Sequence, residues 1–265
     1  MDTSDPKPQL DADLARRLHR ALTAGKDELF QVAEDPSPAV LRALLKNPQL
    51  DENHLQALLK RRDLSEEYLR SVYGIPMVES SHLLKVALVR NPGTPTPVVL
   101  ALLPHLHLFE LVNICYLPGA TADQKLVSER AIIQRLPTTP LGAKITLARR
   151  ATSVVVDALL QEGDKRLMEP CLNNGSLKEA AVFRFLSGPR ANAETISFVA
   201  RHPKWKARPN LRLAILKNNH TPVVWYSLFL PGIPVGELRN LLASQRLTPV
   251  QRQAIRDEGK RRGLG

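Results

Sequence analysis

The sequence predicts an all-α protein, a right-handed α-solenoid of short helical repeats with an internal duplication. Three observations predict this fold class. The chain matches itself without a gap at an offset of 127, so that Leu84 recurs as Leu211; a shorter repeat with a period of 14 runs through positions 37–74; and no segment shows sustained alternation of apolar and polar residues. Aromatic residues make up only 5% of the chain while Leu and Ala are abundant, which suits packed helices better than sheets.

The long-range match pairs residues 81–136, the first large copy, with residues 210–258, the second. Each copy is expected to fold as helix, corner, helix, corner, helix, because its apolar residues recur at helical spacing between proline-containing corners. The identical pairs include Leu84/Leu211, Ala87/Ala214, Asn91/Asn218, Thr94/Thr221, Leu103/Leu230, Glu110/Glu237, Thr121/Thr248 and Gln124/Gln251.

Ser-Pro or Thr-Pro pairs mark five expected helix starts, at Ser37, Thr94, Thr139, Thr221 and Thr248. A hydroxyl at the N-cap accepts hydrogen bonds from free backbone N–H groups, and a proline at the first helical position gives up only a donor that has no partner. These pairs assign five of the 21 prolines to the starts of helices.

Residues 1–10 are expected to form a flexible leader, followed by helices over residues 11–24 and 28–33. Three helices with a period of 14 follow in residues 37–74, with Ser37, Asp51 and Ser65 at their N-caps. Ten-residue helices cannot bury their apolar faces alone, so they must stack on their neighbours.

Five further helices are expected between the large copies, in residues 139–202: at 139–150, 152–162, 164–174, 176–186 and 192–202. Pro170 should kink or split the third of them. No Gly/Ser-rich linker interrupts the chain, so residues 11–262 are interpreted as one continuous helical-repeat domain.

Composition excludes several functional classes. No apolar run approaches the roughly 20 residues that cross a bilayer, and the polar N-terminus does not resemble a secretory signal. The two cysteines, Cys115 and Cys171, are too few for a disulfide scaffold or a thiolate metal site, so a reducing cytoplasm is the expected compartment. No phosphate-binding, dinucleotide, metalloprotease or serine-hydrolase motif is present, so neither an enzyme nor a cofactor is expected.

Several residues invite a chemical role, and for each of them a structural role is the alternative. His105 and His107 lie on either side of Leu106 and should point apart, so a surface or packing role is expected rather than metal binding. Glu110 and Glu237 recur in both copies, which favours a repeated helix cap or ion pair over catalysis. Asn91 and Asn218 are expected to bond the backbone at a helix C-terminus or at the next corner.

The excess positive charge is concentrated near the C-terminus. Of the net charge of +11, residues 201–265 contribute +10, from 13 basic and three acidic side chains. A basic cluster around Trp205 could hold phosphates, with the indole stacked on a base or sugar, or could meet an acidic protein; the alternative is a solvated corner with Trp205 packed against its own helices. The candidate binding residues are Arg201, Lys204, Trp205, Lys206, Arg208, Arg212, Lys217, Arg256, Lys260, Arg261 and Arg262.

The motifs VALVRNPGTP (residues 86–95) and LAILKNNHTP (213–222), with the short leucine-rich helices before them, resemble the HEAT-like and leucine-rich-repeat-variant group of helical-repeat proteins. The resemblance covers most of residues 28–258 and implies a solenoid architecture. Some leucine-rich-repeat-variant proteins carry an N-terminal cysteine cluster that binds iron and sulfur. This chain has no cysteine before Cys115, so that cluster is not expected here.

The architecture predicts a non-enzymatic binding or adaptor protein that does not insert into a membrane. Its expected partner is a protein, and an acidic protein is one version of this hypothesis. The alternative is a nucleic-acid-binding protein that uses residues 201–262. A nucleic-acid repair or modifying enzyme on a HEAT-like scaffold is the third interpretation. The two binding hypotheses differ in whether the cations form one continuous face.

Overall fold

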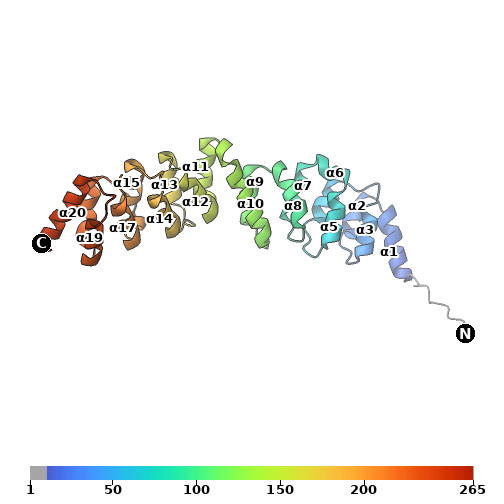
Figure 1. Ribbon diagram of the computed structural model, residues 1–265. Coiled ribbons are helices and arrows are strands. Elements are labelled where there is room, and N and C mark those ends of the chain that lie inside the picture. Colours follow the sequence, from blue (N-terminus) through green and yellow to red (C-terminus); the bar gives the residue numbers. More distant parts are fainter. Residues whose placement is uncertain (1–10, 265) are drawn as a thin grey trace, which may run out of the picture. The chain divides into compact units, whose positions relative to one another are not determined.

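The computed structural model describes residues 11–264 and is all-helical (Figure 1). The described residues contain 20 α-helices, three short 3₁₀ helices and no strand, so the all-α prediction is confirmed. Every helix in this part of the chain is too short or too polar to span a lipid bilayer. The expected leader, residues 1–10, lies outside the described residues.

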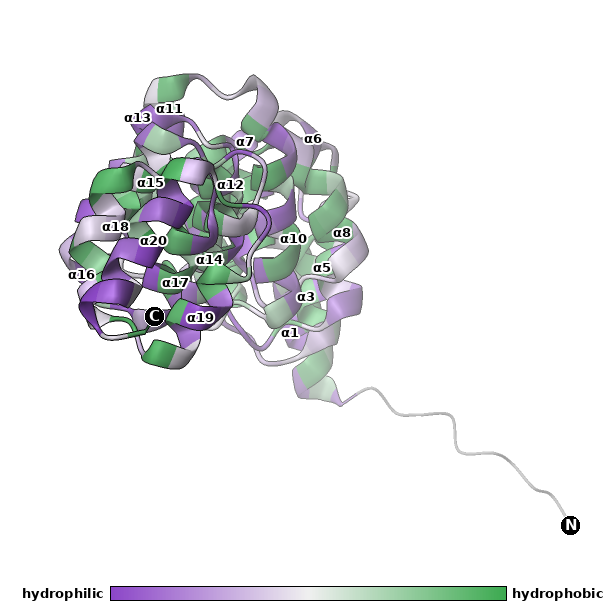
Figure 2. Ribbon diagram, turned by 60° about the vertical axis from the view of Figure 1, so that its left-hand side comes forward, coloured by the Kyte–Doolittle hydropathy of each residue, from purple (hydrophilic) through white to green (hydrophobic). Residues whose placement is uncertain are grey.

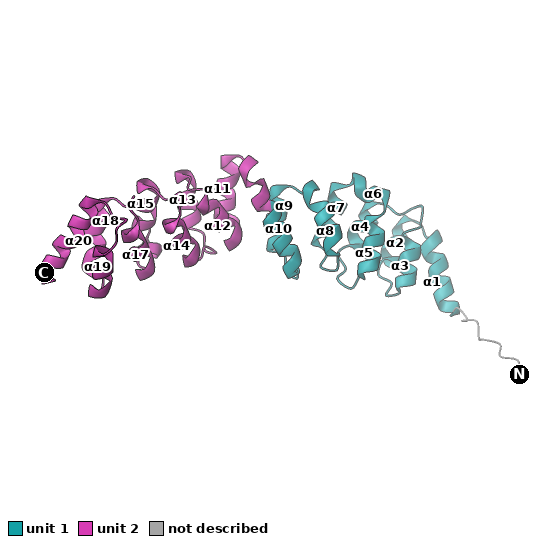
Figure 3. Ribbon diagram, viewed as in Figure 1, with its two compact units in different colours: residues 1–131 teal, residues 132–265 magenta. Residues whose placement is uncertain are grey.

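The chain divides into two compact units, residues 1–131 and 132–265 (Figure 3). The helices that begin in unit 1 are α1 (Ala12–Thr23), α2 (Lys26–Val32), α3 (Pro38–Leu44), α4 (Glu52–Leu58), α5 (Glu66–Tyr73), α6 (Pro76–Ser80), α7 (His82–Arg90), α8 (Thr96–Leu102), η1 (Leu103–His105), α9 (Leu108–Cys115) and α10 (Ala122–Arg135).

The elements that begin in unit 2 are η2 (Leu136–Thr138), α11 (Leu141–Arg150), α12 (Ser153–Gln161), α13 (Lys165–Leu172), α14 (Glu179–Ser187), α15 (Ala193–Arg201), α16 (Pro203–Lys206), α17 (Pro209–Lys217), α18 (Val223–Phe229), η3 (Leu230–Gly232), α19 (Val235–Leu242) and α20 (Pro249–Arg261).

Helices α3, α4 and α5 begin 14 residues apart, at Pro38, Glu52 and Glu66. Asp51 and Ser65 cap α4 and α5 with their side chains: Asp51 accepts hydrogen bonds from the backbone of Asn53 and His54, and Ser65 from that of Tyr68. Ser37 occupies the N-cap of α3 without a side-chain hydrogen bond.

Within each unit, helices pack against their successors and also against the next helix but one or two. In unit 1, α2 contacts α4, α4 contacts α7, and α7 contacts α9; in unit 2, α12 contacts α14 and α14 contacts α17. Most helices carry a hydrophobic and a hydrophilic side (Figure 2). The hydrophobic sides bury residues such as Leu84 and Leu211, which are fully inaccessible, so stacking supplies the core that single short helices lack.

Element boundaries recur at the offset of 127 that relates the two sequence copies. Helix α7 runs from His82 to Arg90, and α17 runs over the matching positions from Pro209 to Lys217; α18 matches α8, η3 matches η1 and α19 matches α9 in the same way. The recurrence extends upstream of the predicted copies, because the starts of α12, α13, α14, α15 and α16 match those of α2, α3, α4, α5 and α6 at the same offset. The pattern therefore reaches back to Lys26, upstream of the two large copies defined from the sequence.

The predicted role of the Thr-Pro pairs is right at one end of the chain. Thr248 is the N-cap of α20, its hydroxyl accepts a hydrogen bond from the backbone N–H of Gln251 at 3.3 Å, and Pro249 is the first helical residue.

At three other Thr-Pro pairs the prediction is wrong, because the helix begins one residue after the proline. The hydroxyl of Thr94 instead donates at 2.6 Å to the Leu88 carbonyl in the last turn of the preceding helix, a carbonyl that also accepts from the backbone N–H of Asn91 at 3.1 Å. Thr221 donates to Ile215 at 2.5 Å, and Thr139 donates to Arg135 at 2.8 Å.

Two predictions in the middle helices are also corrected. Helix α14 begins at Glu179 rather than near Ser176, because the backbone N–H of Ser176 is bonded by the Asn174 side chain at 2.7 Å in the preceding turn. Pro170 does not split α13, which is continuous from Lys165 to Leu172.

Candidate functional site

The basic cluster of residues 201–217 lies on α15, α16 and α17 of unit 2, which contact one another. Lys204, Lys206 and Arg208 are exposed there, and Arg212 is half-buried, with its Nε donating to the Lys206 carbonyl at 2.5 Å. This contact places the side chain of Arg212 beside α16. The structure thus gathers the cations of this segment on three consecutive helices.

Trp205 is the exception, because its side chain is only 1% exposed. The indole Nε1 donates to the Leu172 carbonyl at 2.9 Å, and the ammonium group of Lys204 lies 4.2 Å from the ring centroid. A buried ring that is already hydrogen-bonded has no free face for a base. The predicted stacking role is therefore wrong, and the alternative, in which Trp205 packs against its own helices, describes the structure.

Several of the candidate cations already have partners inside the unit. Arg208 lies 3.7 Å from a carboxylate oxygen of Glu179, and Arg201 donates to the Ser197 carbonyl at 3.1 Å. Pairs at such exposed positions are weak and leave the cations available to a ligand.

The tail cations differ in how firmly they are held. Arg262 bonds the Glu258 carboxylate and the carbonyls of Leu230 and Ile233, so it fastens the end of α20 to η3. Arg261 pairs with Glu258 at 3.1 Å, whereas Arg256 and Lys260 are exposed and have no ion pair to another described residue. Arg262 is thus a structural residue rather than a free binding group.

Each unit also contains a hollow at an equivalent position. In unit 1 the hollow has a volume of about 430 Å³ and lies along α4 and α7. In unit 2 two adjoining hollows lie along α14 and α17, and they share Phe183, Ala214 and Lys217. Ten of the eleven residues that line the unit 1 hollow have a lining counterpart at the repeat offset, including Leu59/Leu186, Val86/Leu213, Ala87/Ala214, Arg90/Lys217 and Asn91/Asn218.

The hollows combine apolar and cationic linings. The unit 1 hollow has Leu83, which is 59% exposed, beside Lys60, Arg62 and Arg90, and no acidic residue lines it. In unit 2, Phe183 is 46% exposed. One of the two hollows there is lined by Lys217, His220 and Arg246, and the other adds Glu179 and Glu237. The arrangement can take an apolar side chain flanked by negative charge.

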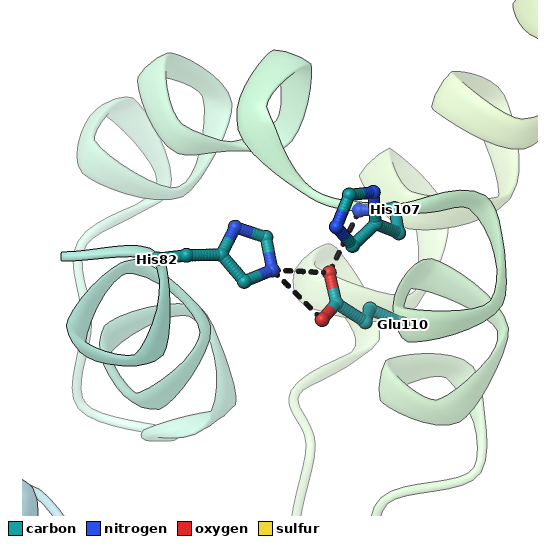
Figure 4. Close-up of side chains that lie close together, drawn as sticks. All are labelled: His82, His107 and Glu110. Atoms are coloured by element: carbon teal, nitrogen blue, oxygen red, sulfur yellow. Dashed lines mark hydrogen bonds and ion pairs between the residues drawn. The ribbon is translucent and has the colours of Figure 1, made fainter.

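A third feature is a cluster of two histidines and a glutamate in unit 1 (Figure 4). His82 is the first residue of α7, His107 is the N-cap of α9, and Glu110 lies in the first turn of α9. Nε2 of His82 lies 2.8 and 3.0 Å from the two carboxylate oxygens of Glu110, and the two imidazole centroids are 4.7 Å apart. One ligand atom from each of the three side chains lies within 4.8 Å of the others.

Glu110 is held as a carboxylate. Burial raises the pKa of its carboxyl group, but the hydrogen bonds from the His82 ring and from the backbone N–H of His107 outweigh burial, so the pKa lies below its ordinary value. The bond from His107, at 2.7 Å, makes Glu110 part of a capping box.

Glu110 and Glu237 are expected from the sequence to share one role, either as a helix cap or in an ion pair, but each has a different one of the two. Glu110 is a helix cap, whereas the residue that corresponds to His107 in unit 2 is Pro234, which has no N–H to donate. Glu237 instead lies 3.8 Å from Lys217, as an ion pair.

Sequence reasoning considered His107 together with His105 and missed His82. The two histidines of the cluster come from different helices, and only the packing of α7 against α9 brings them together. The signal that could have found them is the repeat itself, because the first turns of two stacked helices lie side by side.

The two thiols are unreactive by position. Cys115 and Cys171 are both buried and unpaired, and burial raises the pKa of each to about 12.

Comparison of the chain with protein-family models, with curated proteins and with solved structures found no match.

Proposed function

We propose that this chain is a non-enzymatic binding protein, an adaptor that takes an acidic segment of a protein partner at the equivalent hollows of each unit. The observation that carries the proposal is the recurrence of the hollow on α4 and α7 in the hollows on α14 and α17, at the offset that relates the two copies. Concave sites with apolar linings and a few polar groups are where proteins usually bind ligands.

The acidic character of the partner segment follows from charge complementarity. Lys60, Arg62 and Arg90 line the same hollow as the exposed Leu83 in unit 1, and no acidic residue lines that hollow. A segment that offers one apolar side chain between carboxylates would bury the apolar surface and pair the cations. The +10 charge of residues 201–265 attracts the same kind of partner from a distance.

We place this function on a right-handed α-solenoid of HEAT-like repeats whose second half duplicates the first. The recurring helix boundaries and the recurring contacts of α7 and α17 support the duplication. The cytoplasm is the proposed compartment, in keeping with two cysteines that are buried and unpaired.

Selection from a phage-displayed random peptide library on the immobilised chain tests the proposal. We expect recovered peptides to combine Leu or Phe with Asp and Glu. The variant Leu83→Glu/Phe183→Glu should no longer bind the recovered peptides, because it removes apolar contact and adds negative charge at the hollows of both units. The charge-matched control Leu100→Glu/Val224→Glu changes residues that are 50% and 58% exposed and line none of these hollows. This control should still bind the peptides.

The proposal fails if selection recovers no acidic peptides, or if the control variant loses binding as completely as the hollow variant.

A second candidate function, nucleic-acid binding by residues 201–262, is favoured by the concentration of charge in that segment and by the exposed Lys204, Lys206 and Arg208. A pull-down from native lysate with and without nuclease treatment separates the two candidates. Partners that disappear after nuclease treatment favour nucleic acid, and partners that remain and are displaced by the selected acidic peptides favour the adaptor.

A further inference from the structure

We propose that His82, His107 and Glu110 form a binding site for one divalent transition-metal ion, with Zn²⁺ as the ion of choice. The site is independent of the hollows, since none of its three residues lines one of them. Two imidazoles and one carboxylate are a ligand set that Zn²⁺ accepts, with a fourth position left for water.

The geometry requires little rearrangement. The three ligand atoms lie within 4.8 Å of one another, and Nε2 of His82 is 2.8 Å from Oε1 of Glu110. With metal–ligand bonds of about 2.0–2.2 Å, tetrahedral ligands stand roughly 3.3–3.5 Å apart. The contact between His82 and Glu110 must therefore open by about half an ångström, and ligand atoms that stand as much as 4.8 Å apart must close by about an ångström, which side-chain rotations supply.

The site is open to solvent, so an ion can enter without unfolding the helices. The side chains of His82 and Glu110 are 38% and 28% exposed, and His107 is exposed. The ligands are also held in place, because Glu110 is fixed by its bond from the His107 backbone and because α7 packs on α9. A bound ion would join the first turns of these two helices.

The repeat provides an internal comparison that separates a ligand site from a requirement of the fold. At the repeat offset, Glu237 occupies the position of Glu110, but Pro209 and Pro234 stand in place of the two histidines. Proline suits the start of a helix, and α17 and α19 keep the boundaries of α7 and α9. The helices therefore form without histidine, and the two histidines occur together only beside Glu110.

Titration of the full chain, prepared without a polyhistidine tag, with ZnCl₂ in a calorimeter tests the site. We expect one ion per chain in the wild type. His82→Ala and His107→Ala should each weaken binding by more than about tenfold, the lower end of the loss seen when even an outer-shell partner of a ligand is removed. His105→Ala and Glu237→Gln are the matched controls and should leave the affinity unchanged, because neither residue is in the cluster.

A second variant tests whether the same three ligands create a metal site at the equivalent position of unit 2. Pro209→His/Pro234→His places histidines beside Glu237, and we expect the stoichiometry to rise from one ion to two. Circular dichroism confirms that each variant is folded. Absence of Zn²⁺ binding by the wild type, retention of full affinity in His82→Ala/His107→Ala, or equal loss in His105→Ala would each overturn the proposal and leave the His82–Glu110 contact as a hydrogen bond only.

Discussion

Asn91 and Asn218, which occupy equivalent positions of the two copies, share two hydrogen bonds at the ends of α7 and α17, and Asn91 makes a third, to the Arg61 carbonyl at 2.7 Å. The side-chain amide of Asn91 donates to the Leu59 carbonyl at 2.9 Å, and that of Asn218 donates to the Leu186 carbonyl at 2.7 Å. In both, the side-chain oxygen accepts from the backbone N–H two residues later. The predicted role of these asparagines at helix ends and corners is confirmed. Asn47 and Asn174 bond helix-end carbonyls in the same way.

Replacing either asparagine by alanine should destabilise the fold. Asn91→Ala leaves a buried carbonyl at the end of α4 without its donor, which costs about 1–3 kcal/mol of unfolding free energy, and Asn218→Ala should cost a similar amount. Urea denaturation measures the loss. The exposed Asn113 and Asn240, also related by the repeat offset, are the matched controls and should change stability by less than about 0.5 kcal/mol when replaced by alanine.

The two leucines at the starts of η1 and η3 should contribute strongly to the core. Leu103 and Leu230 are 5% and 2% exposed, so truncation to alanine should cost about 2–5 kcal/mol each. Leu100→Ala, at a position that is 50% exposed, is the control. Losses below half a kcal/mol at both buried sites would contradict this assignment of the core.

Trp205→Ala should affect stability rather than binding. The indole is fully packed and donates to the Leu172 carbonyl, so its removal should cost about 3–5 kcal/mol. Lys206→Ala, one residue away and exposed, should stay within about 0.5 kcal/mol. In a Trp225→Phe background, which leaves Trp205 as the single tryptophan of the chain, emission of the folded protein should be blue-shifted, as expected for a buried indole. Emission like that of a solvated indole would contradict the packing described.

The cysteines should resist alkylation while the chain is folded. Since burial raises the pKa of Cys115 and Cys171 to about 12, roughly one thiol in ten thousand is ionised at pH 8. Iodoacetamide should therefore label both slowly in buffer and rapidly in urea, as followed by mass spectrometry. Rapid labelling of one cysteine in the folded chain would show that its helix opens locally.

If the basic segment binds nucleic acid, affinity should fall steeply with salt, because each neutralised phosphate releases condensed counterions. For about five contacts, log K against log salt should slope at roughly −3.5 for single strands and −4.5 for duplex. Replacing Lys204, Lys206 and Arg208 by alanine should flatten the slope by about two to three units. Fluorescence anisotropy with labelled oligonucleotides measures both slopes. Binding that is absent at low salt, or unchanged in the triple variant, would count against this candidate.

Periodicity revealed the helices because their boundaries depend on local signals such as Asp51 and Ser65, which cap their own helices. Where one side chain can form either of two local hydrogen bonds, the sequence alone did not show which of them forms. Thr94 can bond forward as a cap or backward to the preceding helix, and the backward bond to Leu88 forms because the helix starts beyond Pro95.

The candidate sites were less accessible to prediction. The exposure of Lys204 and Lys206 agrees with their charge, but the orientation of Trp205 depends on Leu172, which belongs to another helix. His82 and Glu110 also come from different helices and meet only through packing. Spacing along one helix cannot reveal such pairs.

The hydrogen bonds that side-chain amides donate from one helix to the backbone of another join residues only 20 to 35 positions apart. Contacts between helices therefore stay local along the chain within each unit, as in a linear array of coupled neighbours. A disturbance at one helix is felt by the adjoining helices and fades beyond them, so stability is a local property here. One segment of such a chain can unfold locally when a ligand binds, while the remaining segments stay folded.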